Sequence, residues 1–167
     1  MKNLLQRTWL PLAKLCLVLM AIFSTAACGG PTFIEYTHDG GRFSVMLPGT
    51  DNPEGSTSPS GTKTMSVVWK GVGYLVGWKD LPEMSEQEFM EWVDQDAGST
   101  GTVLRRAEVS FNGMNGLEFE IQRPQGKRAF VRYLRAGNRV YLLMLVGDHL
   151  DLSGPTAQKF LTSFKAL

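Results

Sequence analysis

The sequence has few of the side chains on which most catalytic and metal sites depend. Its 167 residues include two cysteines, Cys16 and Cys28, and two histidines, His38 and His149. It contains no Gly-x-Ser-x-Gly elbow, no His-Glu-x-x-His pair and no phosphate-binding loop. These absences argue against the common hydrolases, zinc proteases and nucleotide-dependent enzymes. We therefore predict a protein without catalytic residues, metal or cofactor, in which both histidines occupy turns or the surface.

Two acidic segments come closest to a metal-binding pattern. The segment that begins at Asp94 faintly resembles a calcium loop, but its twelfth position is Arg105, where such a loop needs a bidentate Glu. Asp148, His149 and Asp151 offer three candidate ligands on one loop after a strand, a combination that is also common by chance. Neither segment leads us to predict a metal site.

The first 34 residues lack acidic side chains altogether. Three basic residues precede an unbroken apolar run at 15–23, and the small residues of 24–27 follow that run. A basic start, a short apolar run and small residues before a break are typical of a secretory signal peptide. A membrane-spanning helix is the alternative, but 15–27 numbers only 13 residues, whereas about 20 are needed to span a bilayer. We therefore predict a cleaved signal peptide at 1–27.

Cys28 is predicted to be the first residue of the mature protein and its lipid anchor. The segment TAAC (25–28) resembles a bacterial lipobox, although Thr25 stands where Leu is usual. The alternatives are simple secretion, because ordinary signal peptidase also reads small residues at Thr25 and Ala27, and a structural thiol in a core. Cys16 leaves with the signal peptide, so the mature chain has no internal disulfide. We expect an extracytoplasmic protein held on the inner or the outer membrane by several acyl chains.

The remaining 140 residues suffice for one domain with its own core. We assign 28–32 to a short tether and 33–167 to that domain. Loss of the three basic residues of the signal leaves 14 basic against 16 acidic residues, a net charge of about −2. Domains that bind nucleic acid are strongly basic, so we expect no nucleic-acid partner.

Alternating apolar residues and glycine-rich turns predict antiparallel hairpins. The first is expected at 33–37 and 43–47, with a turn at Asp39-Gly40-Gly41 because glycine tolerates positive φ. The segment 51–62, rich in Pro, Ser, Gly and Thr, is expected to be a mobile loop. A second hairpin is expected at 64–69 and 72–79. In its latter strand, Gly73 and Gly77 share one face and leave room for a close neighbour.

The rest of the chain reads as a helix, four strands and a closing helix. Ser85 and Glu88 form a capping box, and Phe89, Trp92, Val93 and Ala97 then recur at helical spacing. Strands are expected at 103–111, 117–123, 127–135 and 139–146. The last, RVYLLMLV, is apolar on both faces, which predicts a covering layer on each side and burial of all of 140–146. The fold class is therefore α+β, with an antiparallel sheet of about six to eight strands sandwiched by helices.

Five basic residues are expected at one end of this sheet. In an up-and-down meander alternate connections fall at the same end, which brings together Arg105, Arg106, Arg123, Lys127 and Arg128. The last strand returns to that end with Asp148, His149 and Asp151. One interpretation is a docking surface for an anionic partner, such as lipid headgroups. The other is an ordinary solvated sheet edge with ion pairs that contribute less than about 1 kcal/mol each.

Three segments resemble the PsbP-like superfamily in order and spacing: YTHDGGRFSVMLPG (36–49), RYLRAGNRVYLLML (132–145) and FLTSF (160–164). That superfamily includes photosystem II extrinsic proteins, a nuclear Ran-binding import factor and bacterial lipoproteins of the DcrB-like branch. Within it, the chain most resembles the DcrB-like branch. The resemblance spans essentially the whole mature chain and implies an antiparallel sheet sandwiched by helices. It also implies a binding or assembly-accessory domain, and it carries over no catalytic residue.

The predicted function is that of a lipid-anchored, extracytoplasmic protein that binds an unidentified envelope protein or assists the assembly of a complex, without catalysis. The alternative is an envelope lipoprotein that binds a small ligand or an anion. A deep apolar pocket beside Gly73 and Gly77, or among the clustered basic residues, would favour the alternative. A flat exposed patch without a pocket would favour protein binding.

Overall fold

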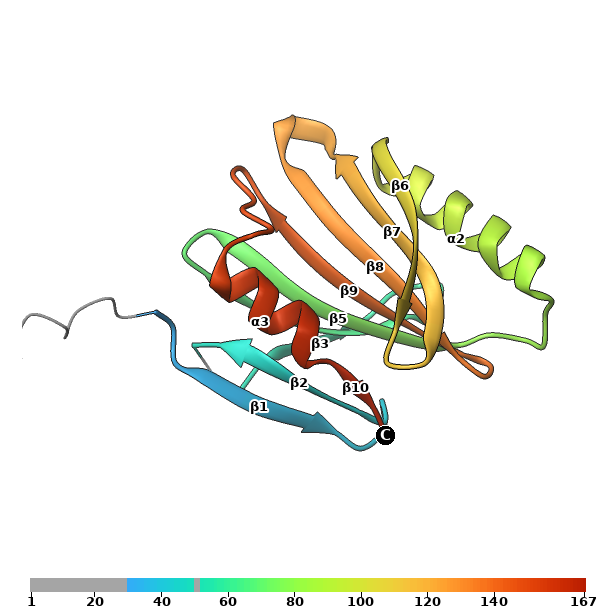
Figure 1. Ribbon diagram of the computed structural model, residues 1–167, viewed down its shortest axis with the longest axis horizontal. Helices are drawn as coiled ribbons and strands as arrows, with labels where there is room; N and C mark the ends of the chain where they lie inside the picture. Colours follow the sequence, from blue (N-terminus) through green and yellow to red (C-terminus); the bar gives the residue numbers. More distant parts are fainter. Residues whose placement is uncertain (1–29, 50–51) are drawn as a thin grey trace, which may run out of the picture. The chain divides into compact units, whose positions relative to one another are not determined.

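The computed structural model describes residues 30–49 and 52–167, and Pro31–Leu167 forms one compact unit (Figure 1). The predicted signal peptide, Cys28 and Asp51 lie outside the described residues. Within them the strands form two sheets, one of seven strands and one of three. No helix in this part of the chain has the length and apolar character needed to cross a bilayer.

The larger sheet is antiparallel and has the strand order β3-β4-β5-β9-β8-β7-β6. Its strands are β3 (Glu54–Thr57), β4 (Lys63–Trp69), β5 (Val72–Asp80), β6 (Thr102–Phe111), β7 (Met114–Gln122), β8 (Arg128–Ala136) and β9 (Arg139–Gly147). The predicted second hairpin is β4–β5, and its turn has positive φ at both Lys70 and Gly71, as a two-residue hairpin requires. The predicted four-strand meander is β6–β9. Both predictions are confirmed.

The prediction of a loop at 51–62 is wrong for 54–57, because these residues form β3. β3 pairs with β4 from Glu54 opposite Ser66 to Thr57 opposite Lys63. The hydroxyls of Ser56 and Thr64 also lie 2.7 Å apart across the pair. All four residues of β3 are exposed, so no apolar alternation marks this strand in the sequence. The free edge of β4 supplies the main-chain partners that make it a strand.

The smaller sheet consists of β1 (Phe33–His38), β2 (Phe43–Pro48) and the short β10 (Lys165–Ala166). The predicted first hairpin is confirmed, but the positive φ of its turn occurs at Arg42 (φ 53°) and not at the glycines. Gly41 is needed for another reason, since a Cβ there would overlap the ring of Phe43. The Gly41 amide donates to Nδ1 of His38 at 2.8 Å, so this histidine, which is the last residue of β1 and is partly buried, supports the turn from the strand.

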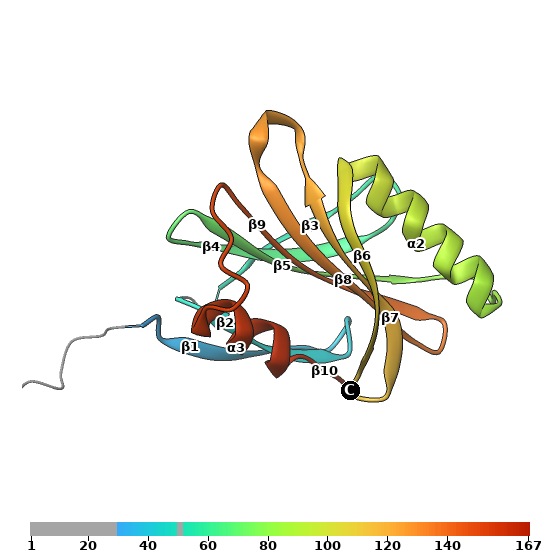
Figure 2. The same ribbon diagram turned by 45° about the horizontal axis from the view of Figure 1, so that its top comes forward.

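The two α-helices within 30–49 and 52–167 cover opposite faces of the larger sheet (Figures 1 and 2). α3 (Pro155–Ser163), together with β2, packs on one face and forms the larger core, in which Phe43, Phe160 and Phe164 are fully buried. α2 (Glu86–Thr100) packs on the other face through Phe89, Val93 and Ala97. It begins at the predicted capping box, where Ser85 Oγ accepts from the Glu88 amide and Glu88 Oε2 accepts from the Ser85 amide. A short 3₁₀ helix, η2 (Pro124–Gly126), connects β7 and β8.

The expectation that every residue of the central strand is buried is wrong for one face. Tyr141, Leu143 and Leu145 of β9 face the α3 side and are at most 2% exposed. On the α2 side Val140 is buried, whereas Leu142, Met144 and Val146 remain partly exposed. A helix is about 10 Å wide and strands are about 4.8 Å apart, so one helix covers only two or three strands. α2 packs over β6 and β7 and reaches Tyr133 of β8, which leaves the part of the sheet from β9 to β3 without a helix.

A largely buried arginine ties the central strand to the first hairpin. Nε and Nη2 of Arg139 donate to the two carboxylate oxygens of Asp80 at 2.6 and 2.8 Å. Its Nη1 donates to the main-chain oxygens of Gly40 and Gly41 at 3.3 and 3.0 Å. The Tyr141 hydroxyl adds a contact to the Gly41 oxygen at 3.1 Å. Nothing in the sequence pattern predicts this network, because it joins residues about 60 and 100 positions apart.

Candidate functional site

The structure divides the five predicted basic residues into two groups. Arg105 and Arg106 are consecutive on β6, so their side chains leave opposite faces of the sheet. Arg105 Nη1 lies 3.2 Å from Glu120 Oε1, and Arg106 Nε lies 2.8 Å from Asp94 Oδ1. Each arginine therefore has a carboxylate that offsets its charge. These two residues lie near the expected end of the sheet but add little net charge to it.

Arg123, Lys127 and Arg128 lie together where β7 turns into β8 through η2. The Arg123 amide donates to the Lys127 oxygen at 2.8 Å, which closes the turn. Lys127 and Arg128 are exposed and Arg123 is partly exposed. None of the three forms an ion pair with a described residue. Arg128 is in register with Gly147, so the end of β9 reaches this turn as predicted.

Of the acidic residues that follow β9, Asp151 has a local structural role. Its Oδ1 accepts from the Ser153 amide and hydroxyl and from the Gly154 amide, at 3.1, 2.7 and 3.0 Å. The Ser153 hydroxyl is the main reason why the pKa of Asp151 lies below its usual range. Asp148 and His149 are exposed. Among the described residues, no three His, Cys, Asp or Glu side chains are grouped so as to hold a metal ion.

A fourth cation, Lys70, belongs to the same end of the sheet and was missed from the sequence. It occupies the β4–β5 turn, and a Cβ built at Gly147 would lie 3.3 Å from the main-chain oxygen of Gly71 in that turn. β9 therefore has the Lys70 turn on one side of its end and Arg128 on the other. Two strand spacings, about 10 Å, separate them. We call Lys70, Arg123, Lys127 and Arg128 the basic end.

The amino-terminal side of the domain reaches the basic end as well. The Gly49 amide donates to the Thr32 oxygen at 2.8 Å. A Cβ at Gly49 would lie 2.6 Å from the indole ring of Trp69, which directly precedes Lys70. In both ribbon views the start of β1, the β4–β5 turn and the end of β9 lie on the left, away from the β8–β9 turn (Figures 1 and 2).

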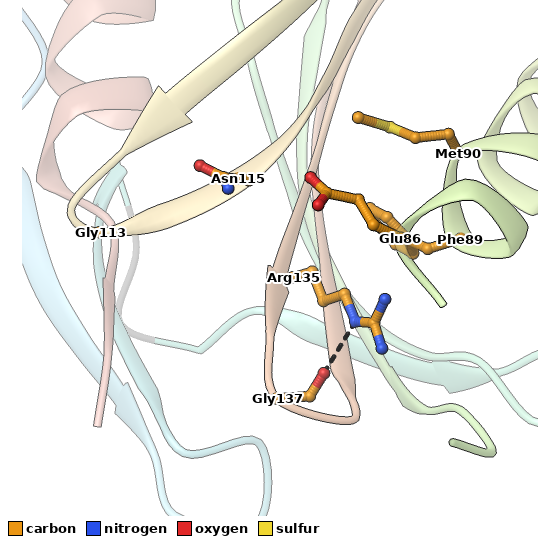
Figure 3. A pocket seen from close by; sticks show the side chains of 7 residues that line it. All are labelled: Glu86, Phe89, Met90, Gly113, Asn115, Arg135 and Gly137. Carbon is orange, nitrogen blue, oxygen red and sulfur yellow. Dashed lines mark hydrogen bonds between the residues drawn. The ribbon is translucent and has the colours of Figure 1, made fainter. Parts of the chain in front are cut away.

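A pocket of about 300 Å³ lies at the opposite end of the sheet, beside the start of α2 (Figure 3). Its lining includes Glu86, Phe89 and Met90 of α2, Asn115 of β7 and Arg135 of β8. The Glu86 carboxylate extends from the helix toward Asn115. Arg135 is fixed by donating to the main-chain oxygens of Gly137, Ser85 and Met84, at 2.9, 3.2 and 2.7 Å. The volume is at the lower limit of small-ligand sites.

The space beside Gly73 and Gly77 is filled by the side chains of the neighbouring strand. A Cβ at Gly73 would lie 3.0 Å from Val146 Cγ1, and one at Gly77 would lie 3.3 Å from Leu142. At the basic end a second pocket, lined partly by Leu104, Arg128 and Leu150, has a volume of about 30 Å³, about that of one water molecule. Neither place offers the deep apolar pocket that the small-ligand alternative calls for.

A strip of apolar side chains crosses the part of the sheet that α2 leaves uncovered. Leu142, Met144 and Val146 of β9 are partly exposed there, as is Leu75 of β5, which lies opposite Met144. On β4, Val68 is 77% exposed. We call these five residues the open strip. Gly73 lies between Val146 and Val68, and Gly77 lies beside Leu142; neither glycine adds a side chain to this face.

Comparison with known proteins identifies the fold. No protein-family model and no curated protein sequence matches the chain. The solution structure of cyanobacterial PsbP (CyanoP) from Synechocystis sp. PCC 6803 matches with a TM-score of 0.55 and 11% identity, over 88% of this chain and 99% of that one. A crystal structure from Bacteroides thetaiotaomicron matches with a TM-score of 0.51 and 10% identity, over 80% of this chain and 48% of that one. The chain therefore has the predicted PsbP-like α+β fold.

Proposed function

We propose that the protein is a non-enzymatic accessory protein of the cell envelope that binds another protein or assists the assembly of a complex. The PsbP-like fold supports a binding role, because the resemblance carries no catalytic motif. We further propose that the chain belongs to the DcrB-like branch of bacterial lipoproteins, which the lipobox-like segment at 25–28 supports. It would then be anchored on the extracytoplasmic side of a membrane by acylated Cys28.

The open strip is the observation that carries the protein-binding role. Leu142, Met144 and Val146 alternate along β9 and span about 13 Å, roughly two and a half turns of helix. Beside them the uncovered strands leave a width of about 15 Å, which accommodates one helix lying next to α2. We therefore infer that the occupant is an amphipathic helix of the partner, with its apolar side on the strip.

Site-specific photocrosslinking in native membranes tests this role. A photoreactive amino acid at Val68 or Met144 should give one discrete adduct with a partner protein. The exposed residues Glu91 of α2 and Lys159 of α3 serve as matched control positions, and neither should give that adduct. Leu75→Glu should abolish the Val68 adduct without changing the amount of folded protein. Adducts of equal yield at all four positions would show that the strip is not a specific interface.

The lipid anchor is tested by comparing the two cysteines. Cys28→Ser should abolish incorporation of labelled fatty acid and release the protein from membranes. Cys16→Ser changes a thiol inside the predicted signal peptide and should leave both properties intact. If the Cys28 variant remains labelled and membrane-bound, the anchor proposal is wrong.

The pocket beside the start of α2 favours a second candidate function, the binding of a small polar ligand. Glu86 and Asn115 supply acceptor and donor groups, while Phe89 supplies apolar surface. Three of the five N–H groups of Arg135 donate to main-chain oxygens, so two remain for a ligand. A metabolite screen by thermal shift, with Asn115→Ala as the comparison, tests this alternative. A ligand that stabilises the parent and the variant equally would exclude the pocket as its site.

A further inference from the structure

We propose that the basic end is a contact surface for an anionic lipid bilayer. This goes beyond the proposed function, which assigns a protein partner to the open strip and an acyl anchor to Cys28. In the cell the anchor at Cys28 would orient the domain on the membrane, but the basic end belongs to the folded domain and can be tested without the anchor. Its chemistry would recognise lipids with phosphate headgroups and a net negative charge.

The charges of this end are available for such a contact. Lys70, Arg123, Lys127 and Arg128 have no ion-pair partner among the described residues. Glu120 shares a pocket lining with Arg128 but is paired with Arg105. The other nearby carboxylates are those of Asp148, which is exposed, and Asp151, whose Oδ1 already accepts three hydrogen bonds in its turn. Outside the Arg105–Glu120 pair, four cations therefore face two carboxylates, although residues 28–167 as a whole carry a net negative charge.

Exposed apolar side chains accompany these cations. Val103 and Leu104, at the start of β6, are 39% and 48% exposed. The β6–β7 register shifts between Val103 and Arg105, so Leu104 has no partner across the pair. Thr102 lies opposite Gln122, the neighbour of Arg123, and Leu104 shares a pocket lining with Arg128. Aliphatic side chains flanked by cations are typical of surfaces that enter the interfacial region of a bilayer.

The path of the chain favours the same orientation. Thr32 is joined to Gly49, and Gly49 lies against Trp69 beside Lys70. Only four residues separate Cys28 from the start of β1, and they reach at most about 15 Å. An acyl chain on Cys28 would therefore hold the basic end near the membrane surface. Screening by physiological salt extends over about 8 Å, so closeness of this kind is required.

Vesicle binding by the isolated domain tests the inference. Residues 31–167 contain both hydrophobic cores, so this domain can be made without the preceding residues. It should bind phosphatidylglycerol vesicles at low salt and not phosphatidylcholine vesicles, and added salt should release it. Each basic residue near an anionic surface contributes about fivefold in affinity. The triple variant R123Q/K127Q/R128Q should therefore bind at least tenfold more weakly.

Two matched controls separate the surface from the overall charge. The variant K63Q/K159Q/K165Q loses the same charge from exposed lysines elsewhere and should bind less than threefold more weakly. Leu104→Ser should lower the salt concentration at which the domain is released, whereas Leu167→Ser, at a residue 66% exposed, should not. Inorganic phosphate at matched ionic strength should not release the domain, because the surface recognises a bilayer and not a single phosphate.

Failure of this inference is distinct from failure of the anchor. If the parent domain does not bind phosphatidylglycerol vesicles at low salt, or if both triple variants lose affinity equally, the membrane-contact surface is wrong. The outcome of fatty-acid labelling at Cys28 is unaffected by either result. Release by inorganic phosphate would show a site for a free anion and would also overturn the inference.

Discussion

Two neighbouring leucines of β9 test directly whether the larger sheet is fully covered on the α3 face but only partly covered on the α2 face. Leu143 is 0% exposed and lies in the core beneath α3, whereas Leu142 lies on the other face and is partly exposed. Leu→Ala removes the same atoms from the same strand in both variants. The difference in unfolding free energy therefore reports how well each face is covered.

The magnitudes follow from burial. At a fully buried site, Leu→Ala costs about 3–5 kcal/mol, since it loses transfer free energy and also leaves a cavity. At Leu142 only part of the side chain leaves water on folding and solvent can fill the space, so we expect a cost of about 1–2 kcal/mol. For a domain of this size 1 kcal/mol corresponds to a Tm change of about 3–5 °C. Leu143→Ala should therefore lower Tm by about 9–25 °C, and Leu142→Ala by about 3–10 °C.

Urea denaturation followed by tryptophan fluorescence measures both costs, provided that the m-values of parent and variants agree. Leu145→Ala and Met144→Ala form a second pair with the same geometry, because Leu145 is 1% exposed and Met144 is partly exposed. Similar costs for the two members of each pair would show that the α2 face is covered as fully as the α3 face. The open strip would then not be a surface, and the protein-binding proposal built on it would fail.

Three further predictions concern single side chains. Hydrogen bonding to Arg139 lowers the pKa of Asp80 in the folded protein. The ionised Asp80 therefore stabilises the folded state above the ordinary carboxyl pKa of about 4, and this contribution is lost as the pH falls through the lowered pKa of Asp80. Arg139→Gln should therefore weaken the fall of the urea midpoint on acidification, and an unchanged pH profile would contradict this. Gly116→Ala should prevent folding, because its Cβ would overlap the main chain of β8. Gly98→Ala should instead stabilise the protein by up to about 1 kcal/mol, because Gly98 lies on the exposed part of α2 with no atom near its Cβ position. Circular dichroism melts in which Gly116→Ala is not the less stable variant would contradict this packing. Ser85→Ala should lower stability by about 1 kcal/mol in the same melts, and no change would mean that the capping box contributes nothing.

The site was only partly predictable from the sequence. Hairpin connectivity predicted that Arg123, Lys127 and Arg128 would gather, because neighbouring strands of a meander must turn at a common end. The same connectivity could not predict the carboxylates that neutralise Arg105 and Arg106, since their side chains project to different faces. Lys70 was missed because it joins this end only through the pairing of β5 with β9. The pocket beside α2 was missed because its lining comes from α2 and from turns far apart in the chain.

What the sequence determined by itself is the set of local structures. Period-two alternation predicts the strands of the meander, Ser85 and Glu88 set the start of α2, and Lys70-Gly71 makes a two-residue turn. Each of these depends on interactions within a few residues, which the sequence displays directly. The tertiary structure decided what depends on lateral packing, namely that β3 pairs with the edge of β4 and that Arg139 is buried against Asp80. It also decided that α2 covers β6 and β7 and leaves Leu142 and Met144 partly exposed, because one helix is narrower than a sheet of seven strands.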